Sequence, residues 1–326
     1  MTVLLTCAAL LPAVVLLIYI YVKDRVEKEP IGLLLTLFAL GAAICLPAAL
    51  IEELFSTVID GVFSTFAYDI GGSLYLMSGT NKLYVFASNF IGVALVEEGL
   101  KFLILLLVTR KNKNFNSLFD GVIYSVFVSL GFAALENVLY VLEYGFVNAV
   151  ARAISAVPAH MFFAVIMGCF YSYWHMFEKA RTIEWELHRQ GYIPSVKNRF
   201  SGSHYLVLSI LLAVAAHGFY DYCCSMEESI YLVILIAFLI FLYVVCFMNV
   251  RRFSKRDTMD RPWVIFQLVK KYPALASYLT VNESGEFIFK TLDTPVSTFQ
   301  NTFAASPGTF QSGTPQYQDF DNRPDM

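Results

Sequence analysis

The chain has 326 residues, of which 57% are hydrophobic and 15% are charged, and its formal net charge is −3. With a mean hydropathy of +0.60, this composition excludes an ordinary soluble domain and suggests no nucleic-acid partner. It is typical of a polytopic membrane protein.

Several apolar runs are long enough to cross a bilayer as helices. They lie at about residues 3–21, 31–51, 84–108, 121–142, 148–174, 205–224 and 230–250. We therefore expect an all-α polytopic membrane protein with a bundle of about seven transmembrane helices. No Lys or Arg precedes the first run, so it reads as a retained helix and not as a cleaved secretory signal.

The basic residues alternate between the loops. Lys and Arg follow the first, third, fifth and seventh runs, whereas residues 52–83 contain only Lys82 among four acids. Arg152 lies at the outer end of the fifth run. Because Lys and Arg accumulate on the cytoplasmic side, we expect the N-terminus outside and the C-terminus in the cytoplasm.

Outside the runs, the sequence predicts three different segments. Residues 52–83 form either an amphipathic lid on the outer membrane surface or a plain packed loop, and residues 175–204 a short amphipathic helix and linker on the cytoplasmic side. We expect a transmembrane domain at residues 1–252, with its motif-bearing core at 84–224, and a cytoplasmic tail at 253–326. The tail contains one small helix and is largely disordered after about residue 294.

The third run carries Glu97, Glu98 and Lys101 near its middle. Each ionised group at membrane depth costs roughly 2.5 to 3.5 kcal/mol on insertion scales, which makes a functional site the default interpretation. Lys101 follows the glutamates by four and three residues, so one of them can pair with it on a helix. The other must face a water-filled cavity, hold a proton or meet a partner on another helix.

The next three runs carry further polar groups. Glu136 and Asn137 lie in the fourth run, His160 in the fifth, and His217 and Asp221 in the sixth. Glu136 has no basic residue within a helical turn, so it takes up a proton or meets a cation such as a metal ion. Asp221 follows His217 by four residues, a spacing that suits a carboxylate orienting an imidazole. At about 1.5 Å rise per residue, these groups fit one layer, so we expect one polar chamber among the third to sixth runs.

In these motifs the sequence resembles the PrsW-type intramembrane peptidases, within the superfamily of CAAX-prenyl endopeptidases and bacteriocin-processing enzymes. The resemblance rests on Glu97-Glu98-x-x-Lys101, on Asp120-Gly121 with Gly131-Phe132-x-x-x-Glu136-Asn137, on the His160 helix and on His217-x-x-x-Asp221. In the CAAX-type branch a histidine stands at the position of Glu136, so that branch's ligand set cannot be copied. The resemblance implies a bacterial cell-membrane peptidase that cleaves a membrane-anchored protein, and in bacterial relatives the first cut of an anti-sigma factor.

The resulting hypothesis is an intramembrane endopeptidase in which Glu97 or Glu98, preferably Glu98, activates water. Zn²⁺ would be bound by His160 and His217 together with Glu136. Two further roles complete the site: Asp221 would orient His217, and Asn137 would donate to the oxyanion. In a metal-free version, the histidines and Asn137 stabilise the oxyanion and the glutamate remains the base.

Two other function classes stay open at this point. An ion- or proton-coupled transporter would use the same Glu, His and Asp cluster as a cation path, and it predicts pH-dependent flux without cleavage. A seven-helix receptor fits the expected topology but gives no reason for an E-E-x-x-K helix facing two histidines. Lipid bilayer and a membrane-anchored protein substrate are the partners that the peptidase hypothesis requires.

Overall fold

The computed structural model describes residues 2–70, 73–76, 80–196, 200–281 and 287–289. It consists of two compact units, Met1–Val264 and Ile265–Met326. The predicted disordered segment after residue 294 lies outside the described residues, and the predicted domain boundary at 252 stays a prediction.

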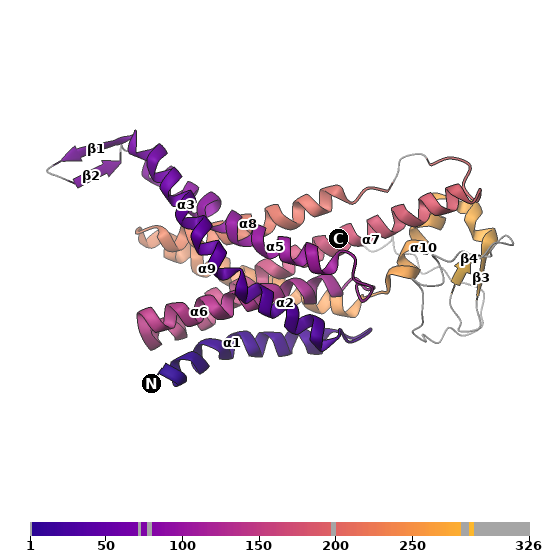
Figure 1. The fold of residues 1–326 in the computed structure, drawn as a ribbon, viewed down its shortest axis with the longest axis horizontal. Helices are drawn as coiled ribbons and strands as arrows, with labels where there is room; N and C mark the ends of the chain where they lie inside the picture. The colour runs from indigo at the N-terminus through magenta and orange to yellow at the C-terminus, as the bar shows by residue number, and fades with distance from the viewer. Residues whose placement is uncertain (1, 71–72, 77–79, 197–199, 282–286, 290–326) are drawn as a thin grey trace. The chain divides into compact units, whose positions relative to one another are not determined.

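The first unit is a helical bundle with one small hairpin (Figure 1). Its helices are α1 (Thr2–Lys23), α2 (Ile31–Ala43), α3 (Cys45–Ser64), α4 (Thr80–Ala87), the π-helix η1 (Ser88–Ala94), α5 (Leu95–Thr109), α6 (Asp120–Ile154), α7 (Ala156–Arg189), α8 (Ser203–Ser225) and α9 (Ser229–Lys255). Strands β1 (Ala67–Ile70) and β2 (Ser73–Leu76) pair antiparallel beyond the end of α3. Helix α10 (Asp260–Lys271) runs across the boundary between the units.

The second unit contains the 3₁₀-helix η2 (Pro273–Tyr278) and strands β3 (Leu279–Val281) and β4 (Phe287–Phe289), which pair antiparallel. The small helix that the sequence predicts in the tail corresponds to α10 and is followed by η2.

The all-α polytopic class is confirmed. Among the described residues, six helices are long and apolar enough to cross a membrane: 6–23, 31–64, 120–148, 150–189, 203–225 and 229–255. The remaining predicted run, 84–108, is present as the consecutive helices α4, η1 and α5. It is divided because its hydrogen-bond pattern changes to that of a π-helix immediately before the charged residues.

Two predictions about these segments are wrong, and one helix begins later than its span. The second span does not end at residue 51 but continues to Ser64 as α3, so part of the predicted lid or loop is helix. The helix α7 begins only at Ala156, because α6 continues past a break at Gly145 (φ +80°) to Ile154, although the segment long and apolar enough to cross the membrane begins at residue 150, close to the predicted 148. Residues 175–189 form no separate amphipathic helix, since no Gly or Pro interrupts α7 between Gly168 and its end at Arg189.

Helix α6 is the centre of the bundle. Of its membrane-crossing segment, 78% is buried inside the protein, compared with 11% for α9 at the periphery. Two glycines allow α2 to approach α6 closely: a Cβ at Gly131 would lie 2.1 Å from the carbonyl oxygen of Phe38, and one at Gly41 would lie 2.0 Å from that of Val128. Such contacts between backbones are the usual way in which membrane helices associate, because lipid gives no hydrophobic drive between them.

We expect Gly131→Ala to lower stability by about 1 to 3 kcal/mol or more, because the added methyl group meets backbone that cannot rotate away. Gly32→Ala on α2 is the matched control, since a Cβ there meets nothing within 4 Å. Thermal unfolding in detergent measures both. Equal midpoints for the two variants would contradict the close approach of α2 and α6.

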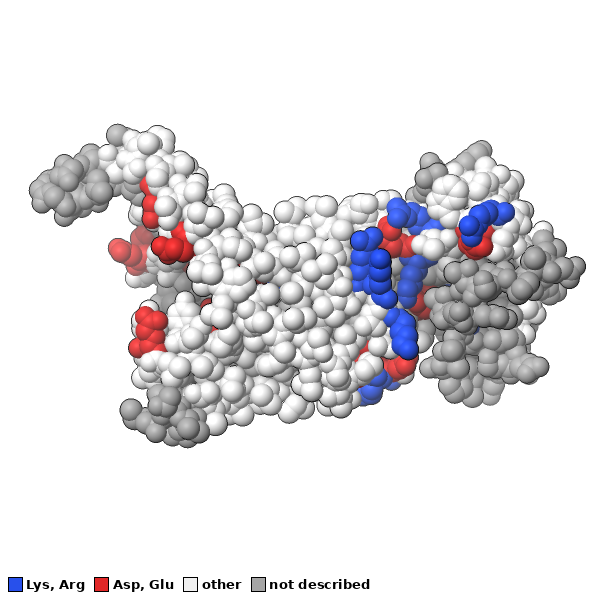
Figure 2. All heavy atoms as spheres, viewed as in Figure 1, with Lys and Arg blue, Asp and Glu red and all other residues white. Residues whose placement is uncertain are grey.

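The charged side chains of the first unit are separated along the bundle. Figure 2 shows Lys and Arg gathered at one end, together with some Asp and Glu, only Asp and Glu at the opposite end, and between them a wide zone almost without charge on this face. This zone is suited to contact lipid, and the separation is the one that the positive-inside rule requires for the predicted orientation. The orientation itself remains a prediction.

At the end of the bundle that we expect to face the cytoplasm, the linker between α1 and α2 buries a carboxyl group. Glu29 is only 3% exposed, and it accepts a hydrogen bond from the hydroxyl of Tyr124. Its backbone N–H donates to Asp24 Oδ2 at 3.3 Å. The pKa of Glu29 is raised to about 7, chiefly by burial and also by the charge of Asp24, while the hydrogen bond from Tyr124 opposes the rise.

The raised pKa of Glu29 predicts how stability depends on pH. Between its ordinary pKa of 4.5 and about 7, the folded protein holds a proton that the unfolded chain releases, so stability falls as pH rises through this range and levels off above it. We expect Glu29→Gln to reduce this dependence, part of which remains because burial also raises the pKa values of Asp24 and Asp257, and to be more stable than the natural protein at pH 8 by on the order of 1 to 3 kcal/mol. Thermal midpoints from pH 5 to 8 test this, with the exposed Glu53→Gln as control. A stability of the natural protein that increases from pH 5 to 7.5 would argue against it.

Candidate active site

The charged residues of α5 face the interior of the bundle. Glu97, Glu98 and Lys101 are 5%, 0% and 1% exposed. Lys101 Nζ donates to Glu97 Oε2 and to Glu98 Oε1, each at 2.8 Å. The sequence predicts that only one of the two glutamates pairs with Lys101, whereas in the structure the ammonium group of Lys101 binds both carboxylates. Glu98 Oε2 is buried and has no hydrogen-bond partner among the described residues.

The π-helix η1 holds this part of α5 against α8. A Cβ at Gly218 would lie 2.6 Å from the ring of Phe90, so α8 packs directly on η1 beside His217. One turn of π-helix shifts the side chains that follow it around the helix axis, and such turns often occur at functional sites. The turn therefore helps to set which way the two glutamates point.

His217 lies between the carboxylates of α5 and Asp221. Its Nδ1 is 2.9 Å from Glu98 Oε1, and its Nε2 is 3.1 Å from Asp221 Oδ2 and 3.9 Å from Glu97 Oε2. The imidazole stacks on Phe163, with ring centres 4.9 Å apart. When Nε2–H donates to Asp221, the lone pair of Nδ1 faces a carboxylate oxygen. The lone pairs of His217 Nδ1 and Glu98 Oε1 would repel each other at this distance, so a proton or a cation must lie between them.

His160 lies in the first turns of α7, held by Ser129 Oγ, which donates to the carbonyl oxygen of His160 at 2.9 Å. Pro158 is tolerated next to it because the first turn of a helix needs no N–H donors. His160 Nε2 is 3.0 Å from Glu136 Oε2, and Nδ1 is 3.3 Å from Lys101 Nζ. The imidazole thus connects the α5 cluster with α6.

Four of the predicted residues form a group that could hold a metal ion. Single ligand atoms of Glu97, Glu98, His160 and His217 all lie within 4.8 Å of one another, and all four residues are buried. Two other predicted residues flank the group, Asp221 against His217 and Glu136 against His160.

Asn137 lies outside this group. Its Nδ2 donates to the carbonyl oxygen of Ala9 on α1 at 2.8 Å, and its Oδ1 accepts from Arg152 Nε at 3.0 Å. Both ends of the amide are therefore engaged away from the carboxylate pair.

Sequence reasoning did not place two charged residues near the group. Arg152 Nη2 lies 2.8 Å from Glu136 Oε2. The sequence feature that could have indicated its importance is that Arg152 is a basic residue on the expected outer side, where the positive-inside rule predicts few Lys and Arg residues. Glu52, on the continued second span, lies close enough for the charges of Glu97 and Glu136 to act on it. It could be found only by knowing that α3 continues past residue 51.

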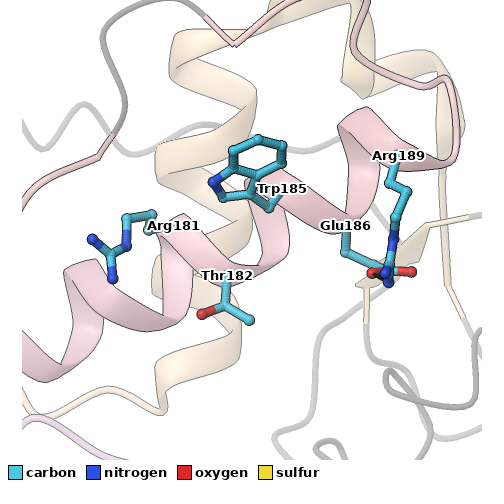
Figure 3. Close-up of a pocket in the computed structure, with 5 residues that line it drawn as sticks. All are labelled: Arg181, Thr182, Trp185, Glu186 and Arg189. Carbon is cyan, nitrogen blue, oxygen red and sulfur yellow. Dashed lines mark hydrogen bonds and ion pairs between the residues drawn. The ribbon is translucent and has the colours of Figure 1, made fainter.

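A cavity of about 510 Å³ lies elsewhere, on the far part of α7 (Figure 3). It is lined by Arg181, Thr182, Trp185, Glu186 and Arg189. Its arginines are neutralised by neighbouring acids, Arg181 by Glu178 and Arg189 by Glu186. The lining offers neither an imidazole nor a pair of carboxylates, so it is a weaker candidate for catalysis than the buried group.

A buried carboxylate pair facing two histidines, inside a bundle of membrane-spanning helices, defines an intramembrane hydrolase with a site able to hold a metal ion. The model of the PrsW family of intramembrane metalloproteases matches residues 29–248. The chain belongs to this family.

Curated relatives agree with the family match. The chain is 31% identical to Protease PrsW of Oceanobacillus iheyensis over 78% of its own length and 97% of the relative. It is 33% identical to Protease PrsW of Geobacillus kaustophilus over 69% and 81%, and 27% identical to that of Bacillus subtilis over 72% and 89%. No solved structure matches. The protein is therefore a multi-pass bacterial intramembrane protease, and the transporter alternative finds no support.

Proposed function

We propose that this protease cleaves a membrane-anchored protein at the buried group, with Glu98 as general base and with Zn²⁺ held by His160, His217 and Glu97. The observation that carries this proposal is the closeness of the four ligand atoms, all within 4.8 Å of one another. By resemblance to the family, we propose an anti-sigma factor as the substrate.

The donor set suits zinc, which catalytic sites commonly bind through two imidazoles and one carboxylate. The charge balance points to a divalent cation as well. With neutral histidines, the network joined by direct contacts carries four negative and two positive groups, a net charge of −2, from Glu97, Glu98, Glu136 and Asp221 against Lys101 and Arg152. An unbalanced charge of this size is costly at membrane depth, and one Zn²⁺ would neutralise it.

Lys101 contacts three members of the group, Glu97, Glu98 and His160. Its ammonium group thus marks a position that favours positive charge. An ammonium group and a metal ion cannot share this position, so metal binding requires Lys101 to withdraw from at least one partner.

Each residue then has a chemical task. Glu98 Oε2, which has no partner among the described residues, accepts a proton from the attacking water and later returns it to the leaving amine. Asp221 accepts the Nε2–H of His217, and Glu136 accepts that of His160, so each imidazole keeps its Nδ1 lone pair toward the group. A bound zinc ion would lower the pKa of the water and polarise the scissile carbonyl.

Metal analysis together with cleavage tests this proposal. We expect the purified protein to contain one zinc ion per chain, His217→Ala to lose both the zinc and the cleavage of a membrane-anchored substrate in proteoliposomes, and His188→Ala to retain both. His188 is a suitable control because its Nδ1 contacts the carbonyl oxygen of Ile193, near the end of α7. Full cleavage by a metal-free enzyme in the presence of chelator would overturn the zinc assignment and leave the glutamate mechanism.

A further inference from the structure

Arg152 is the only Lys or Arg between residues 114 and 178 of the sequence. It lies on the last two turns of α6, after the break at Gly145 and before α7 begins at Ala156. The break redirects the chain, and the guanidinium group reaches residues of α6 that precede it by fifteen and sixteen positions.

The guanidinium group is held by three side chains of α6. Nε donates to Asn137 Oδ1 at 3.0 Å, Nη2 lies 2.8 Å from Glu136 Oε2, and the group lies 4.0 Å from the centre of the Tyr140 ring. Asn137 is itself fixed by its hydrogen bond to Ala9 of α1. The side chain of Arg152 is 14% exposed, so these contacts are largely shielded from solvent. A fixed, shielded guanidinium group is well suited to orient a carboxylate.

Glu136 Oε2 lies in an ion pair with Arg152 Nη2 and 3.0 Å from His160 Nε2; the contact with Nη2 is electrostatic, because Nη2 forms no hydrogen bond among the described residues. An ionised carboxylate can only accept hydrogen bonds, so the proton of the neutral imidazole must lie on Nε2. The lone pair of Nδ1 then points to the other side of the ring, where Lys101 Nζ lies at 3.3 Å. The orientation of Glu136 thus decides which nitrogen of His160 faces the catalytic group.

We propose that Arg152 is a positioning residue of the active site, acting through Glu136 to hold His160 in the tautomer whose Nδ1 faces Glu97, Glu98 and His217. The effect of Arg152 on metal affinity rests on the proposed function, whereas its effect on the tautomer of His160 does not. Arg152 touches neither the carboxylate pair of α5 nor His217, and its effect passes along Arg152–Glu136–His160.

Four variants test this chain of contacts: Arg152→Met, Arg152→Lys, Glu136→Gln and the double variant Arg152→Met/Glu136→Gln. Arg152→Met removes the charge but keeps an unbranched side chain. The double variant removes both charges, so no lone buried ion remains to unfold the protein. Arg251→Met, at an exposed arginine near the end of α9, is the control.

We expect Arg152→Met to weaken zinc binding, measured by competition with a chelator, by about 10- to 100-fold and to lower kcat by a similar factor, while KM stays within about twofold. Arg152→Lys restores part of both, because an ammonium group can reach Glu136 without the two-sided contact of the guanidinium group. The double variant is no worse than Glu136→Gln alone, since the two residues act in one chain. We expect the ¹⁵N spectrum of labelled histidine rings to show the Nε2–H form of His160 in the natural protein and a mixture of tautomers in Arg152→Met.

Folded Arg152→Met with the zinc affinity, kcat and His160 tautomer of the natural protein would overturn the proposal. Effects of Arg152→Met and Glu136→Gln that multiply in the double variant would also overturn it, because they would show independent action. A natural protein that binds no zinc refutes the metal part of the proposed function. In that case the tautomer and kcat measurements still decide the role of Arg152.

Discussion

Glu98→Gln is expected to lower the rate of substrate cleavage by about 10²- to 10⁴-fold per folded molecule, the usual effect of losing a general base. Glutamine keeps the shape of the side chain and can still accept from Lys101, but its amide cannot take a proton from water. The atom proposed to accept the proton is Glu98 Oε2, which has no hydrogen-bond partner among the described residues, and the substitution abolishes this role. Cleavage of a membrane-anchored substrate in proteoliposomes, normalised to folded enzyme, gives the rate.

Glu97→Gln separates the two glutamates. As a proposed ligand, Glu97 should affect zinc content as well as rate, whereas Glu98→Gln should leave zinc bound. The exposed Glu53→Gln serves as control for both. If Glu97→Gln and Glu98→Gln retained the natural rate, the active site proposed here would be wrong.

Lys101→Met is expected to cause the largest loss of stability, about 3 to 5 kcal/mol, because two buried carboxylates lose the cation that they share. Both oxygens bound by Lys101 Nζ lie at 2.8 Å, and the lysine side chain is 1% exposed. Lys82→Met is the matched control, since Lys82 pairs with Glu228 at 3.5 Å with side chains 57% and 51% exposed. An exposed pair of this kind contributes at most about 1 kcal/mol. Thermal unfolding in detergent compares the two variants.

Zinc should stabilise Lys101→Met more than it stabilises the natural protein. In the variant, a divalent cation meets Glu97 and Glu98 without competition from the ammonium group, and binding to the folded state alone raises the midpoint. The measurement is the shift of the thermal midpoint between chelator and added zinc. An equal shift in both proteins would indicate that Lys101 and the metal ion do not compete for the same position.

The sequence by itself determined the class of this protein and most members of the site. Composition identified the spans, because apolar length is a local property of the chain. Spacing identified Glu97, Glu98 and Lys101, because residues three and four apart on a helix face the same way. The motifs then indicated the family, which the comparisons confirmed.

Only the tertiary structure decided how these residues meet across helices. Glu136 is adjacent to His160 rather than in the four-membered group, the amide of Asn137 is engaged with α1 and Arg152, and Lys101 binds both glutamates. The rotation and depth of each helix fix these contacts, and they depend on packing between residues far apart in sequence, such as Gly131 against Phe38. A helical repeat of 3.6 residues specifies a face within one helix but not the face that it meets on another.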